Sequence, residues 1–222
     1  MKLAHVDFIF LFIAHITTLS LTHAYEGCVV QYGRKGCHHR VLEGVLVTCD
    51  GQNREKSIPT NVPQDTVYLS LINFRLGTLK SSDFSENIQT VECLQITDSG
   101  ITKIEHKAFQ NMLELKELTL ENTHITSESL KFINEMSFEP VLLSITGSPY
   151  LHNLSFQPTP NLNYLKTLSF ADNAIRSIHP GIYEELKSVE KLDLSGNHLD
   201  HLDWTEFNKM EFLNMLYLDN NK

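Results

Sequence analysis

One pattern recurs through the second half of the chain, and it constrains the fold more than any other feature. Residues 165–175, 189–199 and, cut short, 213–221 match LxxLxLxxNxL. The asparagines of these three copies are 24 residues apart and are Asn173, Asn197 and Asn221. A fixed period of this length indicates stacked repeats, in which each unit buries its apolar side against its neighbours.

The same register extends upstream in weaker copies. Its fourth position is always leucine, at intervals of 24 or 25 residues: Leu69, Leu94, Leu118, Leu143, Leu168, Leu192 and Leu216. Its sixth position is always apolar: Leu71, Ile96, Leu120, Ile145, Phe170, Leu194 and Leu218. Its ninth position is degenerate before the three asparagines: Phe74, Ser99, Thr123 and Ser148. We therefore expect about seven repeats over 66–222, the last incomplete.

This alternation predicts an α/β repeat solenoid, a horseshoe with a parallel concave sheet. Residues at the fourth and sixth positions of a short strand point the same way, into a shared interior. Each buried leucine there contributes roughly 1.5–3 kcal/mol. The ninth-position asparagines are expected to bond main-chain groups of the turn after each strand. Phe84, Phe109 and Phe207 are expected to close the outer side of the core.

The first residues have the layout of a secretory signal peptide. Lys2 precedes an apolar run over 8–14, and the small residues Thr22 and Ala24, at the −3 and −1 positions, suit cleavage after Ala24. The run is too short to span about 30 Å of hydrocarbon. Because no second long apolar segment follows, we expect a secreted, extracellular chain without a membrane span. The net charge of −9 disfavours nucleic acid as the main partner.

Four cysteines in an exported chain predict disulfides: Cys28, Cys37, Cys49 and Cys93. Three of them fall in 25–65, which indicates a stapled N-terminal cap. Cys28 and Cys37 flank the turn-rich stretch 32–36, which favours pairing them. A Cys49–Cys93 bond spans two strand spacings, about 9–10 Å, and requires displacement from ideal register. Pairing of Cys93 with Cys37 or Cys28 stays open, as does a free or intermolecular Cys93.

Residues 45–222 resemble the extracellular leucine-rich-repeat family. The segment Val45-Leu-Val-Thr-Cys49, followed by 57–59, 62–63 and 69–71, is similar to that family's N-terminal cap running into the first repeat. Cys28 with Cys37 nine residues later resembles the hairpin caps of secreted insect repeat proteins of Toll-like or immune type.

The resembling family normally ends in a C-terminal cap, and no such cap is recognisable in the sequence up to Lys222. The open end around Leu216 and Leu218 has two interpretations. One is a truncated chain. The other is an end that docks on a second copy or on a partner, so that the protein self-associates.

The concave sheet face is the expected partner-binding surface. Seven strands at ~4.8 Å make an arc of roughly 30–35 Å, enough for a protein-sized contact. The predicted contact residues come from the third and fifth positions and are Tyr68, Glu117, Leu142, Lys191, Met215 and Tyr217. Asn153-Leu-Ser155 is an N-glycosylation sequon.

No catalytic motif accompanies the repeats, and we expect neither an enzyme nor a cofactor. His198 and His201, with Asp200 and Asp203, do not have the spacing of a helical zinc motif, so no metal is expected. The predicted function is recognition of a protein or microbial glycan, in immune recognition or modulation of Toll-type signalling. The alternative is an extracellular matrix or cell-adhesion protein, or the truncated ectodomain of a leucine-rich-repeat receptor.

Overall fold

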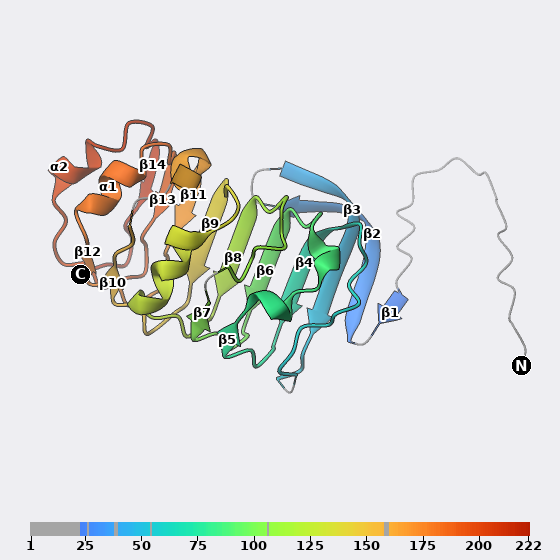
Figure 1. Cartoon of the computed structure of the whole chain (residues 1–222). Coiled ribbons are helices and arrows are strands. Elements are labelled where there is room, and N and C mark those ends of the chain that lie inside the picture. Colours follow the sequence, from blue (N-terminus) through green and yellow to red (C-terminus); the bar gives the residue numbers. More distant parts are fainter. Residues whose placement is uncertain (1–22, 26, 38–39, 54, 106, 158–159) are drawn as a thin grey trace, which may run out of the picture.

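A computed structural model describes residues 23–25, 27–37, 40–53, 55–105, 107–157 and 160–222 as one curved solenoid (Figure 1). The predicted signal peptide 1–24 lies outside these residues except for His23 and Ala24, which belong to the first short strand. Among the residues that the structure describes, we find no helix with the length and apolar character that a membrane span requires.

One ten-stranded sheet runs the length of the solenoid. Its first three strands are antiparallel: β1 (His23–Tyr25), β2 (Cys28–Cys37) and β3 (Arg40–Asp50). The others follow β3 in parallel: β4 (Thr66–Ile72), β6 (Cys93–Thr97), β8 (Glu117–Glu121), β9 (Leu142–Thr146), β11 (Thr167–Ser169), β13 (Lys191–Asp193) and β14 (Met215–Tyr217). The predicted parallel sheet is confirmed.

The leucines of neighbouring repeats lie opposite one another, as the period requires. The register pairs are Leu69↔Leu94, Leu94↔Leu118, Leu118↔Leu143, Leu143↔Leu168, Leu168↔Leu192 and Leu192↔Leu216. All of these side chains except Leu216 are at most 2% exposed. Leu216 is half-buried because its strand has a sheet neighbour on one side only.

Short elements on the return side close the core. Two small parallel sheets pair β5 (Thr78–Leu79) with β7 (Lys103–Ile104), and β10 (Asn153–Leu154) with β12 (Ser177–Ile178). The helical turns are η1 (Ser81–Asp83), η2 (Glu86–Ile88), η3 (Ser127–Glu135), η4 (Pro160–Tyr164), α1 (Gly181–Glu185) and α2 (Trp204–Phe207). Phe84 and Phe109 pack here with tilted rings whose centroids are 6.0 Å apart, as expected for residues that close the core.

The ninth-position asparagines bind the backbone of two repeats at once. Asn197 is buried; its Oδ1 accepts from the amide of Ile175 at 3.0 Å, and its Nδ2 donates to the carbonyls of Phe170 and Leu194 at 2.8 and 3.0 Å. Asn173 and Asn221 repeat this arrangement. A side chain with both donor and acceptor is needed to satisfy these turn groups.

The disulfides are Cys28–Cys49 and Cys37–Cys93, so the favoured Cys28–Cys37 pairing was wrong. The stretch expected to be a turn is part of β2, and the antiparallel hairpin β2–β3 places Cys28 opposite Cys49, with Cα atoms 4.0 Å apart. Cys37 lies at the far end of that hairpin. Cys49 pairs in register with Leu71 and faces the main core, whereas Cys93 lies beside Tyr68 on the concave side.

Candidate binding surface

The hairpin β2–β3 covers the first repeats of the concave face. Cys37, Leu42 and Leu46 from the hairpin pack with Tyr68 and Cys93 in a small apolar cluster separate from the main core. Tyr68 and Cys93 occupy third positions, which alternate with the core leucines and so point out of the concave side. The N-terminal part of the predicted binding surface is therefore covered by the chain itself.

Three of the six predicted contact residues are buried, and two of them, Tyr68 and Glu117, lie beside residues of the hairpin or its disulfide. Tyr68, Glu117 and Leu142 are 5%, 2% and 2% exposed. The Tyr68 hydroxyl donates to Gln95 Oε1 at 2.7 Å, and Lys35 Nζ lies 5.2 Å from the Tyr68 ring centroid. Burial raises the pKa of Tyr68, partly offset by a side-chain hydrogen bond with Ser70. In this structure the three side chains therefore offer almost no surface to a partner.

Glu117 lies beside the disulfide that anchors the hairpin. One of its carboxylate oxygens and the sulfur atoms of Cys37 and Cys93 all lie within 4.8 Å of one another. Within the described residues these three form the one group with ligand atoms close enough for a metal ion. Because both sulfurs belong to a disulfide, they are not available as thiolate ligands.

The other three predicted contact residues lie together on the last repeats. Met215 and Tyr217 are 45% and 37% exposed, and Lys191 is half-exposed. Lys191 Nζ lies 5.0 Å from the Tyr217 ring centroid, and the Tyr217 hydroxyl donates to Met215 Sδ at 3.8 Å. The repeat register alone does not distinguish these accessible residues from the buried residues Tyr68, Glu117 and Leu142.

A second lysine–aromatic pair borders them at the start of the strands, where sequence analysis had not placed a contact. Lys166 Nζ binds Glu190 Oε1 at 2.8 Å and lies 5.7 Å from the ring centroid of Phe212, which is 56% exposed. We call these exposed and half-exposed residues of the last three repeats the open surface: Lys166, Glu190, Lys191, Phe212, Met215 and Tyr217. The sequence signal that could have identified it is the pair of aromatic residues, Phe212 and Tyr217, close to the third-position Met215.

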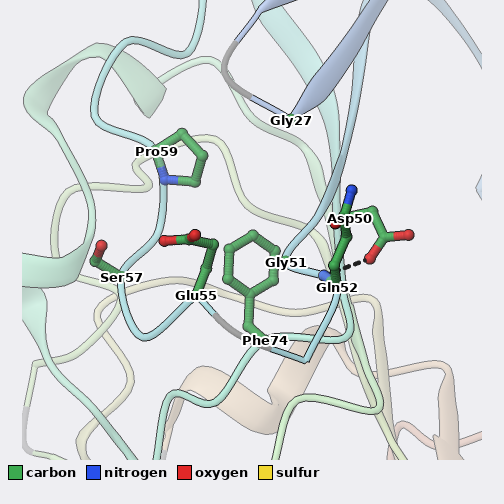
Figure 2. A pocket seen from close by; sticks show the side chains of 8 residues that line it. All are labelled: Gly27, Asp50, Gly51, Gln52, Glu55, Ser57, Pro59 and Phe74. Atoms are coloured by element: carbon green, nitrogen blue, oxygen red, sulfur yellow. Dashed lines mark hydrogen bonds between the residues drawn. The ribbon is translucent and has the colours of Figure 1, made fainter.

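The residues that line a pocket at the N-terminal end of the solenoid do not form a catalytic arrangement (Figure 2). Phe74 lies between Glu55 and Gly51 in this view, and Asp50 Oδ1 accepts from the backbone amide of Gln52 at 2.8 Å. Its side chains offer two carboxylates, with no histidine, cysteine or lysine among the residues that line it. Nothing in it forms a nucleophile–base pair.

Asn153 of the sequon is exposed on β10, on the return side of the solenoid. Ser177 Oγ donates to Asn153 Oδ1 at 2.8 Å. An oligosaccharide attached to Asn153 would project from the return side of the solenoid and would not lie over the ten-stranded sheet.

The period of 24 or 25 residues, the parallel sheet and the column of buried leucines define a leucine-rich-repeat fold. Residues 150–222 match the sequence pattern of the family described as Leucine rich repeat.

Several solved structures share the architecture. Human 5T4 (Wnt-activated inhibitory factor 1, trophoblast glycoprotein) is 22% identical with a TM-score of 0.60, covering 79% of this chain and 67% of its own. Drosophila Toll in its Spatzle complex is 19% identical with a TM-score of 0.52, covering 75% and 25%. TLR13 in complex with ssRNA13 is 14% identical with a TM-score of 0.52, covering 70% and 25%. The chain thus spans about a quarter of the Toll and TLR13 chains, and the likeness concerns the fold.

Proposed function

We propose that the protein is a secreted, extracellular binding module that holds a protein partner on the open surface. The observation that carries this proposal is the contrast along one face: third-position residues are buried from Tyr68 to Thr167 and exposed at Met215. Aromatic and methionine side chains are enriched in protein interfaces, and a few such residues supply most of the binding energy. Lys166 and Lys191 lie over the rings of Phe212 and Tyr217, so they add positive charge to the open surface in a side-chain orientation that is already fixed by these contacts.

Two disulfides and the predicted signal peptide support an extracellular location. A role in immune recognition or in modulating Toll-type signalling is supported by the similarity to Toll, whose complex with Spatzle is described as a hub in development and innate immunity. A microbial glycan is the other ligand class that this role allows.

The second candidate is an adhesive or matrix role, or part of a larger receptor ectodomain. It is favoured by the half-buried leucines of the last repeat, Leu213, Leu216 and Leu218, which would be covered by a further repeat or a second copy. Sedimentation of the purified full chain at several concentrations tests self-association through this end.

We also propose that Asn153 carries an N-linked oligosaccharide, since the sequon is exposed and away from the open surface. Peptide mass spectrometry of the secreted protein, with and without enzymatic deglycosylation, tests this assignment directly.

The binding proposal is tested by capture from extracellular fluid, with quantitative mass spectrometry and the double variant Met215→Asp/Tyr217→Asp. Tyr150→Asp is the matched control, because Tyr150 is 54% exposed and packs on His124 away from the open surface. The proposal requires at least one partner that the wild type and the control retain and the double variant loses. A partner held equally by all three proteins places binding elsewhere.

A further inference from the structure

The hairpin β2–β3 consists of two halves that differ in what holds them. In the half near the solenoid, β3 pairs with β4 from Val45 to Asp50 and thus belongs to the ten-stranded sheet. In the distal half, Gly33–Cys37 of β2 and Arg40–Gly44 of β3 pair with each other, and β3 has no further register partner in β4. The distal half turns across the first repeats instead of continuing along them (Figure 1).

The two halves meet at a pair of glycines. Gly33 lies directly opposite Gly44, and the register of β3 against β4 shifts just beyond, between Val45 and Leu46. Gly44 has φ of +156°, and a Cβ there would come within 3.1 Å of Val67. Both strands thus carry glycine, the residue with the least restricted backbone, at the same level of the hairpin, and the direction of the hairpin changes at this level.

The distal half is anchored at its end by the Cys37–Cys93 disulfide. Apart from this bond, three contacts hold the described part of the distal half on the concave face, and one of them is Lys35 Nζ over the Tyr68 ring at 5.2 Å. Leu42 is buried against the small cluster, and Arg40 forms an ion pair with Glu92 whose side chains are 48% and 30% exposed. An exposed ion pair contributes little to stability, and the small cluster lacks the many neighbours of the main core.

We propose that the distal hairpin is a hinged cover, latched by Cys37–Cys93, and that a dithiol reductant opens it to expose Tyr68 and Glu117. This is a redox control of surface access that goes beyond the proposed function. The thiolate of the reductant attacks one sulfur, which breaks the Cys37–Cys93 bond and forms a mixed disulfide. The second thiol of the reductant then displaces the protein sulfur. The reductant leaves as a disulfide, and Cys37 and Cys93 take up its two electrons and two protons as thiols.

The other disulfide is placed to stay intact. All four cysteines are at most 4% exposed, so the two disulfides differ in their surroundings and not in exposure. Cys28 and Cys49 pack in the main core, within strands that belong to the long sheet. Cys37 and Cys93 lie in the small cluster at the hinged end. Local opening at the hinge brings a reductant to Cys37–Cys93 without disrupting the repeats, whereas access to Cys28–Cys49 requires separation of β2 from β3 in the sheet.

To test the cover, the full chain is incubated with increasing concentrations of dithiothreitol and its free thiols are alkylated. Carboxylates are then labelled with a carbodiimide and an amine, and the labelled sites are quantified by peptide mass spectrometry. Glu121 lies on the same strand as Glu117 and is half-exposed, so it serves as internal reference. In the oxidised protein, Glu117 is expected to be labelled at least about tenfold more slowly than Glu121. After selective reduction of Cys37–Cys93, the labelling rates of Glu117 and Glu121 are expected to agree within about threefold.

The readout needs no ligand, so its outcome is separate from that of the binding proposal. Three results overturn the cover: Glu117 labels readily while the disulfide is intact, it stays protected after Cys37–Cys93 is reduced, or Cys28–Cys49 is reduced first.

Variants test the latch and the hinge separately. In the variant Cys37→Ser/Cys93→Ser, Glu117 is expected to be labelled as fast as in the reduced protein. Amide exchange on β11 and β13 shows whether the repeats of this variant remain folded.

Gly33→Ala adds a Cβ that lies 3.9 Å from Leu46 Cδ1, which is an ordinary contact. The substitution restricts the backbone at the proposed hinge, so the reduction of Cys37–Cys93 should become severalfold slower. Gly36→Ala is the matched control outside the hinge, with no atom within 4 Å of its Cβ. Equal rates for both variants contradict a hinge at Gly33.

Discussion

Thr123 and Ser148, in adjacent repeats, share a hydrogen bond of 2.6 Å between their hydroxyl oxygens, and both residues are 0% exposed. They occupy the ninth position, where the later repeats carry asparagine. The backbone amide of Ser148 in turn donates to Asn173 Oδ1 at 2.7 Å. The column of ninth-position bonds therefore continues through repeats that lack the asparagine, with hydroxyl groups in its place.

This bond predicts coupled effects on stability. Thr123→Val and Ser148→Ala should each lower the free energy of unfolding by about 1–2 kcal/mol, because each leaves the other hydroxyl buried without this partner. The double variant should lose less than the sum, since no unpaired hydroxyl then remains. Urea denaturation of the four proteins in a double-mutant cycle measures the coupling. Strictly additive losses would show that the two hydroxyls do not stabilise one another.

Asn197 predicts a larger loss. Asn197→Ala removes one acceptor and donors to several carbonyls, all inside the fold. Because buried backbone groups are left unsatisfied, we expect a loss of about 3 kcal/mol in the free energy of unfolding. Asn214→Ala, at an exposed position, is the control and should change stability by less than about 0.5 kcal/mol. Similar losses in both variants would contradict the structural role of the ninth position.

The repeats were predictable because their signal is local and periodic. The alternation of the fourth and sixth positions places Leu118 and Leu168 in the interior of the solenoid, and this prediction does not depend on residues far away in the sequence. The cover was not predictable, because it depends on Cys37 meeting Cys93 across 56 residues, with no periodic pattern behind it. One signal was present: Cys93 occupies a third position, so its partner had to come from the concave side. That argument would have excluded pairing with Cys49, but it did not reveal that Tyr68 is covered.

Tyr183 predicts a pH dependence of stability. Burial raises its pKa to about 12, with Glu206 and Asp203 adding repulsion of the phenolate. The folded chain thus holds this proton more tightly than the unfolded chain, whose tyrosine titrates near pH 10. Stability from this group is complete below pH 10 and is lost as the pH rises towards 12.

Denaturant titrations between pH 8 and pH 11 check this dependence. Tyr183→Phe keeps the ring that packs on Phe207, with centroids 4.9 Å apart, but removes the titrating hydroxyl. Its unfolding free energy should therefore decline less above pH 10 than that of the wild type. The same decline in both proteins would assign the pH dependence to other groups.

Tyr68 and Tyr217 predict opposite behaviour although the repeat places both on the concave face. Tyr68 is 5% exposed and its hydroxyl is bonded to Gln95, so Tyr68→Ala should cost about 3 kcal/mol of unfolding free energy and loosen the hairpin. Tyr217 is 37% exposed, so Tyr217→Ala should cost less than about 1 kcal/mol while weakening partner capture. Urea midpoints and capture yields, measured on the same preparations, separate the two effects. A large loss of stability in Tyr217→Ala would make this residue part of the packing of the last repeat and remove it from the open surface.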